Sequence, residues 1–528
     1  MKINKKILIG TLICALMMTG CNSDAPEDEV KNKDEIVISV VEEPQSGFDA
    51  TTGNHGSLTN MIFSTLFKRG ENMEIKNDLA QEYQVSEDRM TWTIKIKEDI
   101  VFSDNEKLTS EDVGYSYEQA KKSGSDIDLS MLESVNIVDD YTIEFNLTNP
   151  QSTFIEKMTD VGIVPKHAHD DKFVDNPIGS GPYKLIQWDK GQQIIFEKNE
   201  SYYGKEANIP KVTLVFLDED SAYAAIKSGD IDLARISSSL ADENIENTKV
   251  YELESIETYG VSYPMNKQEV NENQKIVGND VTSDIAIRKA MTYAIDREEL
   301  VKGILNGHGK SSTTGLENMS WLNKETIIKE DGDIEKAKKI LGDAGWIDTN
   351  NNQIIDKDGI EAEFNLLYTP GEYRQELALM YQLVAQELNI KVNIEMKNWD
   401  TIEDYINKDA VLYGWGSADP SEIYSLYSSE MIDTQALWNN SGQYSNEKVD
   451  EYIDKALQSE SEEEAIKYWK KAQYDGQTGF SSIADCTYTW MINANHLYIS
   501  NDKLDIGNPI IQPHGGRILD NITEWSFN

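Results

Sequence analysis

A central segment of the chain alternates between two hydrophobic periodicities, and this alternation restricts the fold more than any other feature of the sequence. Apolar residues recur at every second position over 362–368 and again over 390–396, as they do in half-buried strands. Residues 372–388 carry apolar side chains at helical spacing, and a short helix over 400–406 precedes a third strand at 411–413. The order strand–helix–strand–helix–strand predicts a parallel sheet with right-handed crossovers, and therefore an α/β fold.

The ends of these strands are where a ligand is expected. In open α/β sheets, ligands bind outside the carboxyl ends of the strands. The first strand ends at Tyr368, directly before Thr369 and Pro370. The third strand runs into the glycine-rich segment 414–419, which ends at Asp419. The pattern thus predicts a binding site before any relative is considered.

Other segments predict further elements of a mixed α/β fold. Residues 35–41 indicate an opening buried strand, and the strict alternation over 91–97 indicates a half-buried strand. Residues 282–306 predict one long helix, because polar cap residues precede apolar residues that share one helical face. Residues 333–341 repeat that pattern behind Asp333, which is a suitable N-cap.

The N-terminus has the features of a secretory signal. Three lysines precede an apolar run over 7–18, which is too short to span a bilayer. Small residues then lead to Cys21, an arrangement that resembles the lipobox of bacterial lipoproteins. We therefore expect a signal peptide over 1–20, lipidation of Cys21 and a flexible acidic tether over 21–35. An ordinary signal peptide that happens to contain a cysteine is the alternative.

The chain is strongly acidic, which argues against two classes of partner. The sequence has 93 Asp and Glu against 49 Lys and Arg, for a formal charge of −44. Such a surface repels nucleic acid and anionic headgroups. An enzyme is not expected either, since neither a G-x-S-x-G elbow nor an H-E-x-x-H motif occurs, and the six histidines lie in no triad-like context.

Cysteine and metal-ligand patterns predict no further chemistry. The other two cysteines lie within or directly after the signal, so Cys486 has no disulfide partner and is expected to be a buried, inert thiol. His167 and His169 could chelate a metal from an extended segment, but a solvated turn is the favoured interpretation. Residues 348–352 alternate Asp and Asn without the Gly and Glu of an EF-hand loop, which favours a polar turn.

Six blocks of the sequence together resemble one known family. In order they are DLAQEYQVSEDRMTWTIKIKEDIVFSDNEKLTSEDVGYSYE, NPIGSGPYKLIQWDKGQQIIFEKNESYYG, AYAAIKSGDIDLA, DIAIRKAMTYAIDREELV, DIEKAKKILGDAGW and GWGSADP. They resemble the family 5 solute-binding proteins, the oligopeptide-, dipeptide- and nickel-binding group. Because the blocks follow the family's order over most of residues 36–460, the resemblance is specific.

The resemblance implies a two-lobed, periplasmic-binding-protein-like α/β fold of type II, cluster C, with an additional domain on the first lobe. The lobes would close on a buried ligand by a hinge motion. The boundaries expected by analogy are a first lobe from 36–55, 181–283 and 496–528, an extra domain over 56–180 and a second lobe over 284–495.

The resemblance also suggests which residues contact the ligand. Asp419 holds the place of a carboxylate that pairs with a ligand α-ammonium, and Arg374 that of an arginine that forks a carboxylate. For both, a surface or interlobe ion pair is the alternative. The backbone over 414–417 could pair with an extended ligand while Trp415 stacks on it, although a core role for Trp415 is equally open. The other residues expected at the cleft are Tyr368, Tyr413, Gly416, Ser417, Glu43 and His55.

The implied function is capture of a short peptide for an ABC permease, by lobe closure, with no cofactor and no chemistry. The protein would be a monomer, anchored by lipid at the outer face of the cell membrane. The alternative within the family is a nickel or metal-chelate binder, although Ala418 stands where some of that branch carry His. A peptide-sensing lipoprotein is the alternative of another class.

Overall fold

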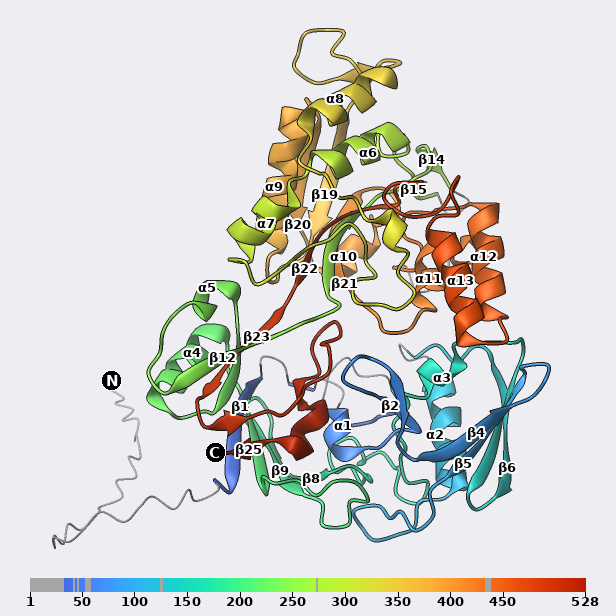
Figure 1. Ribbon diagram of the computed structural model, residues 1–528, viewed down its shortest axis with the longest axis vertical. Helices are drawn as coiled ribbons and strands as arrows, with labels where there is room; N and C mark the ends of the chain where they lie inside the picture. The colour runs from blue at the N-terminus through green and yellow to red at the C-terminus, as the bar shows by residue number, and fades with distance from the viewer. Residues whose placement is uncertain are drawn as a thin grey trace, which may run out of the picture.

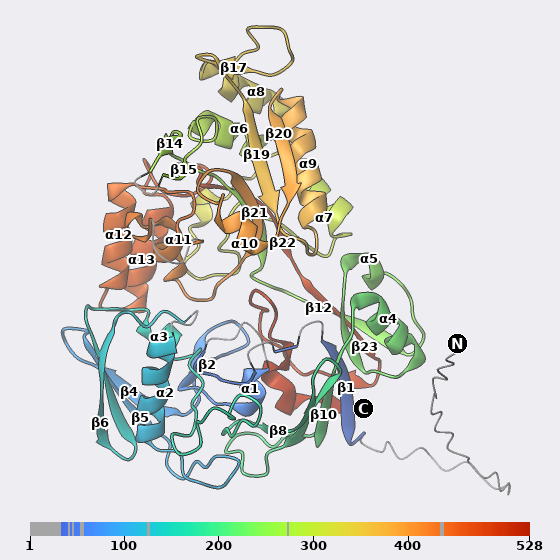
Figure 2. The same ribbon diagram turned by 180° about the vertical axis from the view of Figure 1, so that it is seen from behind.

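The computed structural model describes residues 33–40, 43–44, 47–52, 58–123, 127–271, 274–432 and 438–528. Two β-sheets lie at the centres of two lobes, one below the other in Figure 1, and the view from behind in Figure 2 shows the same separation. The predicted mixed α/β class and two-lobed fold are confirmed. In the described residues no helix is long and apolar enough to cross a membrane.

A seven-stranded sheet forms the first lobe. Its strand order is β12 (Thr248–Leu253), β23 (His496–Asn501), β11 (Leu233–Ile236), β1 (Glu35–Val40), β10 (Lys211–Phe216), β9 (Gln193–Lys198) and β8 (Tyr183–Asp189). Strand β1 confirms the predicted opening strand and pairs in parallel with both β10 and β11. Helices α4 (Glu219–Ser228) and α5 (Ser238–Ala241) belong to this lobe, and α4 packs on β11.

A smaller domain with its own hydrophobic core extends the first lobe. Its four-stranded sheet has the order β4 (Ala80–Val85), β5 (Thr91–Ile96), β7 (Thr142–Leu147) and β6 (Leu132–Asp139). Strand β5 buries every second residue, as its alternation predicts. The remaining elements are α1 (Thr59–Ile62), the β2 (Phe67–Arg69) and β3 (Ile75–Asn77) hairpin, α2 (Ser110–Ser123) and α3 (Phe154–Lys157).

The second lobe contains a six-stranded mixed sheet. Its order is β16 (Gly309–Ser311), β22 (Tyr488–Ala494), β13 (Thr258–Ser262), β21 (Ala410–Trp415), β19 (Glu363–Tyr368) and β20 (Lys391–Met396). Strand β19 pairs in parallel with β20 and β21, which confirms the predicted parallel unit. Its connecting helices are α9 (Arg374–Glu387) and α10 (Trp399–Glu403).

The predicted long helix over 282–306 is wrong in one respect, because it is two helices. These are α6 (Ile285–Ala294) and α7 (Arg297–Ile304), separated by Ile295 in an extended conformation. The break follows from Asp296, whose carboxylate accepts a hydrogen bond from the Glu299 amide and so begins a new helix. Helix α8 (Ile334–Asp343) begins as predicted behind the Asp333 cap.

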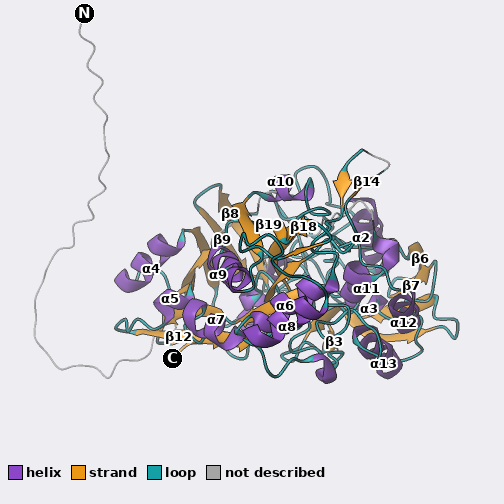
Figure 3. Cartoon of the chain, turned by 90° about the horizontal axis from the view of Figure 1, so that it is seen from above, coloured by secondary structure: helices purple, strands orange, loops and turns teal. Residues whose placement is uncertain are grey.

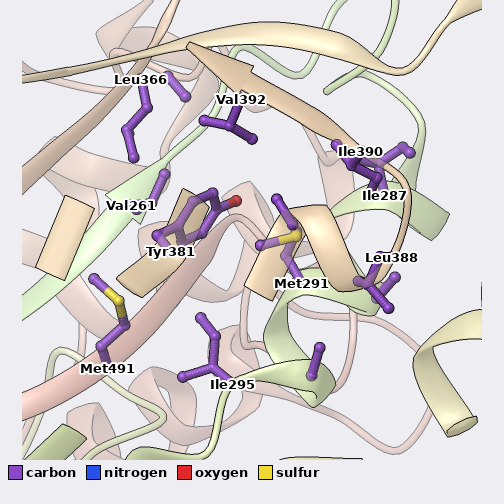
Figure 4. Packing of buried hydrophobic residues seen from close by; sticks show 14 of the residues in the cluster. Val261, Ile287, Met291, Ile295, Leu366, Tyr381, Leu388, Ile390, Val392 and Met491 are labelled. Carbon is purple, nitrogen blue, oxygen red and sulfur yellow. The ribbon is translucent and has the colours of Figure 1, made fainter. Parts of the chain in front are cut away.

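The helices α6 to α9 lie together on the second lobe, as the view from above shows (Figure 3). Beneath them, apolar side chains from the sheet and the helices interdigitate (Figure 4). Met291, Leu366 and Tyr381 each expose 1% or less of their surface in this cluster. Burial of each such side chain stabilises the fold by about 1.5–3 kcal/mol. This core fixes the strand ends from which the candidate site is built.

The other elements complete the second lobe and the periphery. They are α11 (Glu422–Tyr427), α12 (Glu447–Leu457), α13 (Glu462–Gln473), the 3-10 turns Lys324–Thr326, Ser429–Met431 and Ile518–Glu524, and the strand pairs β14 (Glu269–Val270) with β15 (Ile276–Val277), β17 (Asp356–Lys357) with β18 (Ile360–Glu361), and β24 (Leu504–Asp505) with β25 (Ser526–Phe527).

The strand pairing does not agree with the lobe boundary expected at residue 283. Strand β13 lies between β22 and β21 in the second-lobe sheet, although its residues were expected in the first lobe. Tyr259 and Val261 are buried in the second-lobe core, which explains the placement. The chain therefore crosses between the sheets from β12 to β13 and returns from β22 to β23.

Candidate functional site

The two loops predicted to hold a ligand lie where the lobes meet. The loop after β19 carries Glu372, whose carboxylate lies 3.3 Å from the Arg235 guanidinium on first-lobe strand β11. The loop after β21 carries Asp419, whose carboxylate lies 2.7 Å from the Lys157 ammonium in the smaller domain. Both strand ends therefore face the first lobe and its extension, as the topology of an α/β sheet predicts.

Strand β21 is longer than the sequence predicts, and among the described residues one of its backbone edges has no strand partner at the end. On one side β21 pairs with β13 up to Trp415, opposite Thr258. On the other side it pairs with β19 only up to Leu412, opposite Tyr368, where β19 ends. The last three residues of β21 thus continue past its neighbour. Their free edge can accept an added extended chain.

Tyr413 and Trp415 differ in their hydrogen bonding and burial. The Tyr413 hydroxyl lies 2.7 Å from that of Tyr488 in the second-lobe core, and burial raises its pKa. The Trp415 ring packs edge-on against Tyr413 at 5.7 Å and is only partly buried. Within the described residues its indole N–H is enclosed and has no hydrogen-bond acceptor. Trp415 thus has a core contact and an unused donor, whereas Tyr413 is a core residue.

Gly416 and Ser417 shape the loop. A Cβ at Gly416 would lie 2.4 Å from the Ile256 carbonyl oxygen, so only glycine allows the chain to pass this close to the interlobe crossing. The Ser417 hydroxyl accepts a hydrogen bond from the Asp419 amide at 3.0 Å. Both residues position the loop through backbone contacts.

Asp419 lies in a buried cluster of charged groups between the second lobe and α3. Its carboxylate also accepts a hydrogen bond from the Ser421 amide at 2.8 Å. Burial raises the pKa of Asp419, but the charge of Lys157 and the Ser421 bonds outweigh it and hold the pKa below its ordinary value. The adjacent Glu156 bonds to Arg69, yet burial raises its pKa to about 8.

Glu422 belongs to the same cluster and lies one helical turn from Asp419. It is only 7% exposed, and in the described part of the chain one of its carboxyl oxygens has no hydrogen-bond partner. Burial raises its pKa well above the ordinary value, and the negative charge of Asp419 adds to the effect. Asp419 is therefore the main carrier of negative charge in this part of the site.

Arg374 begins α9 as expected and forms no ion pair with any described residue. Its guanidinium lies 5.7 Å from the Tyr259 ring centroid and donates to the Pro370 carbonyl at 3.2 Å. Its enclosed Nε has no acceptor among the described residues. Tyr373 directly before it has a φ of 63°, a strained conformation of the kind found at functional sites. Arg374 thus retains donors for a carboxylate.

Two further expected residues lie elsewhere, and one lies outside the described residues. Glu43, expected at the cleft, accepts bonds from the Trp188 indole at 2.7 Å and the Gly191 amide at 3.0 Å, within its own lobe. Tyr368 is a 7% exposed part of the second-lobe core. His55 lies outside the described residues, as does the lipidation candidate Cys21.

Sequence reasoning missed a second buried network, at the crossings between the lobes. Glu257 accepts hydrogen bonds from Tyr259 at 2.6 Å and from His496 at 2.9 Å, and His514 lies 3.6 Å away. Burial raises the pKa of Glu257, but His496, His514 and Arg235 together hold it below its ordinary value. No local pattern marks these residues, because they come from three distant segments.

The candidate metal ligands have other partners. His167 lies 2.7 Å from Asp104, and His169 lies 3.1 Å from Asp49. Among the residues that the structure describes, no group of three or more such side chains could hold a metal ion. Cys486 is a buried free thiol, as predicted, and burial raises its pKa.

Comparison with known proteins gives consistent results. Residues 74–435 match the family described as bacterial extracellular solute-binding proteins, family 5 Middle. The chain is 30% identical over 488 residues to Protein XP55 of Streptomyces lividans, which covers 89% of this chain and 85% of that protein. It is 26% identical over 553 residues to the oligopeptide-binding protein AppA of Bacillus subtilis, with 97% of each covered. The crystal structure of NikZ from Campylobacter jejuni in complex with Ni(L-His) matches with a TM-score of 0.79 at 26% identity, covering 94% of this chain and 99% of that chain.

Proposed function

This chain belongs to the bacterial extracellular solute-binding proteins of family 5, and we propose that it captures short peptides and delivers them to an ABC permease. Its relatives are binding proteins, so it is not an enzyme. Membership in the family supports a peptide or a metal chelate as ligand. Our proposal is that the ligand is a short peptide and not a metal chelate.

One observation carries the peptide proposal, namely the free edge of β21. Tyr413, Gly414 and Trp415 continue past the end of β19, so their outer backbone groups have no strand partner in the described part of the chain. An extended peptide can pair with such an edge through its main chain, which gives affinity without selecting a sequence. Trp415 lies in this segment with an unused indole donor.

Arg374 supplies the second element of the proposed site. It follows the end of β19, it has no carboxylate partner among the described residues, and its Nε is enclosed without an acceptor. An arginine presents two parallel donors that match a carboxylate. We therefore assign it the carboxylate of the ligand. The strained Tyr373 backbone holds it at this position.

A metal chelate is the second candidate, and the likeness to NikZ favours it. Arg374 would then hold a carboxylate of the chelator, because a multi-carboxylate chelator offers the same group as a peptide terminus. Ala418 precedes Asp419 in place of a histidine, which argues against direct ligation of the metal by the loop.

The remaining parts of the proposal concern closure and anchoring. The lobes would move about the two crossings, with a first lobe from 36–55, 181–256 and 496–528, an extra domain over 56–180 and a second lobe over 257–495. Lipid at Cys21 and the acidic tether over 21–35 would hold the protein, as a monomer, at the outer face of the membrane. A peptide-sensing role would use the same site without a permease.

Identification of the ligand that copurifies with the protein tests the proposal. Native mass spectrometry of the protein purified from its own host shows the bound mass, and denaturing release allows the ligand to be sequenced. A set of short peptides is the expected result. A nickel, cobalt or zinc adduct with a small chelator would replace the peptide proposal with the second candidate.

A further inference from the structure

The Lys157 ammonium is paired with the Asp419 carboxylate, and the contacts around both residues hold this pair in place. The ammonium lies 2.7 Å from the Asp419 carboxylate and 3.3 Å from the Ser421 hydroxyl. The Lys157 side chain is 15% exposed and that of Asp419 11%, so solvent screens the pair weakly. A buried pair of this kind differs from a mobile surface ion pair, which contributes little.

The segment that presents Lys157 is attached to the second lobe at a second point. Ser152, just before α3, donates from its amide to the Leu457 carbonyl at 2.7 Å and from its hydroxyl to the Ala456 carbonyl at 2.9 Å. Within α3, Glu156 is bonded to Arg69 of β2. These contacts hold the lysine where Asp419 meets it.

Among the described residues, Asp419 is the carboxylate in direct contact with this ammonium. The Glu156 carboxylate pairs with Arg69, and burial raises the pKa of Glu422, whereas Lys157 and the Ser421 bonds hold the pKa of Asp419 below its ordinary value. A ligand ammonium at Asp419 would bring a second positive charge within a few ångströms of Lys157. In a weakly screened site that repulsion is strong, so the ligand would have to displace the lysine and leave it buried without a partner.

We propose that Lys157 is a specificity-determining residue: it takes the place of a ligand ammonium at Asp419, so the protein selects ligands that carry no free amine at that end. This inference rests on the proposed peptide function and narrows its substrate class to peptides with a blocked or displaced amino terminus. The ligand carboxylate remains with Arg374.

Binding of trialanine and N-acetyl-trialanine, measured by calorimetry, tests the inference. The wild-type protein is expected to bind the acetylated peptide at least as tightly as the free one. Lys157→Met removes the ammonium that pairs with Asp419, so that a ligand ammonium can bind this carboxylate. The variant is therefore expected to shift the ratio of affinities toward trialanine by about tenfold or more. Lys157→Arg keeps the charge and is expected to keep the wild-type ratio.

Two controls separate specificity from a structural effect. Lys166→Met removes an exposed lysine that pairs with Glu111 in the same domain and is expected to leave the ratio unchanged. Asp419→Asn in the Lys157→Met background removes the ammonium acceptor, so the gained preference for trialanine is expected to disappear. Circular dichroism identifies a variant that does not fold. In that case the ratio of the wild-type affinities for the two peptides tests the inference.

The outcomes distinguish the inference from the function on which it rests. A wild-type protein that binds trialanine about tenfold or more tightly than the acetylated peptide overturns the inference and leaves the peptide function intact. A ratio that Lys157→Met does not change, in a folded variant, also overturns it. If no variant binds either peptide, both the proposed function and the inference fail.

Discussion

At the scale of single residues, the ion-pair partners of the arginines indicate which of them stabilise the fold and which can bind a ligand. Arg235 and Arg297 pair with Glu372 and Asp331, at 3.3 and 2.8 Å. Arg374 has no such partner among the described residues, although it lies two positions from Glu372. Arg288 also lacks a carboxylate among the described residues, but it donates to four backbone carbonyls. Arg374 donates to one carbonyl in the described part of the chain, so its other N–H groups remain available for a ligand carboxylate.

Replacement of Arg374 by Ala is expected to weaken peptide binding by about tenfold to a hundredfold, because a charged hydrogen bond contributes about 1.5–3 kcal/mol. Calorimetric titration of the ligand identified by mass spectrometry measures the change. Lys339→Ala is the matched control, because it removes a positive charge from exposed α8 in the same lobe. Equal affinities for the two variants would contradict the assignment of Arg374.

Buried His496 gives the stability a pH dependence. Burial lowers its pKa below the ordinary 6.5, so it stays neutral in the folded protein where the unfolded chain takes up a proton. The His496 contribution to stability is therefore expected to fall as the pH drops through 6.5 toward the folded pKa, whereas the raised pKa values of Glu156 and Glu422 act in the opposite direction. Thermal unfolding at several pH values measures this, and His496→Gln, which can still donate to Glu257, is expected to show a shallower fall.

His167→Gln provides the comparison for that experiment, since the His167 side chain is 43% exposed. Its unfolding curve should follow the wild-type pH dependence. If His496→Gln and the wild type lose stability in parallel between pH 8 and 5, the lowered pKa of His496 is contradicted.

At the scale of elements, the loop after β21 depends on a close backbone approach. The Gly416 position faces the Ile256 carbonyl, and a methyl group there would lie 2.4 Å from its oxygen. Gly416→Ala is expected to destabilise the protein by about 1–3 kcal/mol, since the backbone must shift to relieve the clash. Urea denaturation measures the loss.

Gly303→Ala is the matched control for the loop. Gly303 lies inside α7, and an added Cβ there meets no atom within 4 Å. Alanine favours the helix, so this variant is expected to be stabilised by about 0.4–1 kcal/mol. A similar loss of stability in both variants would show that the Ile256 contact has no special role.

At the scale of the whole molecule, the smaller domain contacts the second lobe through residues that lie far apart in the sequence. Met73, on the β2–β3 turn, is 9% exposed and belongs to the same buried cluster as Trp321 and Trp469 of the second lobe. The contact between the smaller domain and the second lobe thus buries a hydrophobic side chain of the smaller domain.

Met73→Asp is expected to open the ligand-free protein, because closure would then bury a charge. Aspartate tolerates the left-handed backbone at this position, where φ is 64°, so the change acts through the side chain. A larger radius of gyration in X-ray scattering and a weaker ligand affinity are the expected results. The exposed neighbour Asn72→Asp should behave as the wild type, and an unchanged radius for Met73→Asp would contradict this role.

Anchoring is also a property of the whole molecule. Cys21→Ser is expected to remove acyl labelling and release the protein from the membrane fraction, because it deletes the thiol to which we propose that the lipid is attached. Labelling with radioactive palmitate and fractionation measure both effects. Cys486→Ser, which changes a buried thiol, should remain labelled. Membrane-bound Cys21→Ser would contradict lipid attachment at this residue.

Several features followed from the sequence by itself. The strands β1, β5, β19 and β20 have their predicted places because apolar runs and alternating residue types are local patterns of the sequence. Helix α8 begins at its predicted cap for a similarly local reason, since Asp333 bonds to an amide three residues away. Strand–helix order also predicted the parallel unit, and the candidate binding loops follow its carboxyl ends. The single helix expected over 282–306 failed because apolar periodicity does not register a cap at Asp296 inside it.

Only the tertiary structure decided which residues pair with the candidate site residues and where strand β21 has a free edge among the described residues. Lys157 reaches Asp419 because the smaller domain contacts the second lobe, and no periodicity links positions so far apart. Glu43 bonds within its own lobe because the turn after β8 comes back to it. The free edge of β21 exists because β19 ends earlier, a relation between two strands that neither contains alone. Neighbouring residues determine local backbone preferences. Ion pairs and sheet edges depend instead on which segments, distant in the sequence, come into contact in the folded protein.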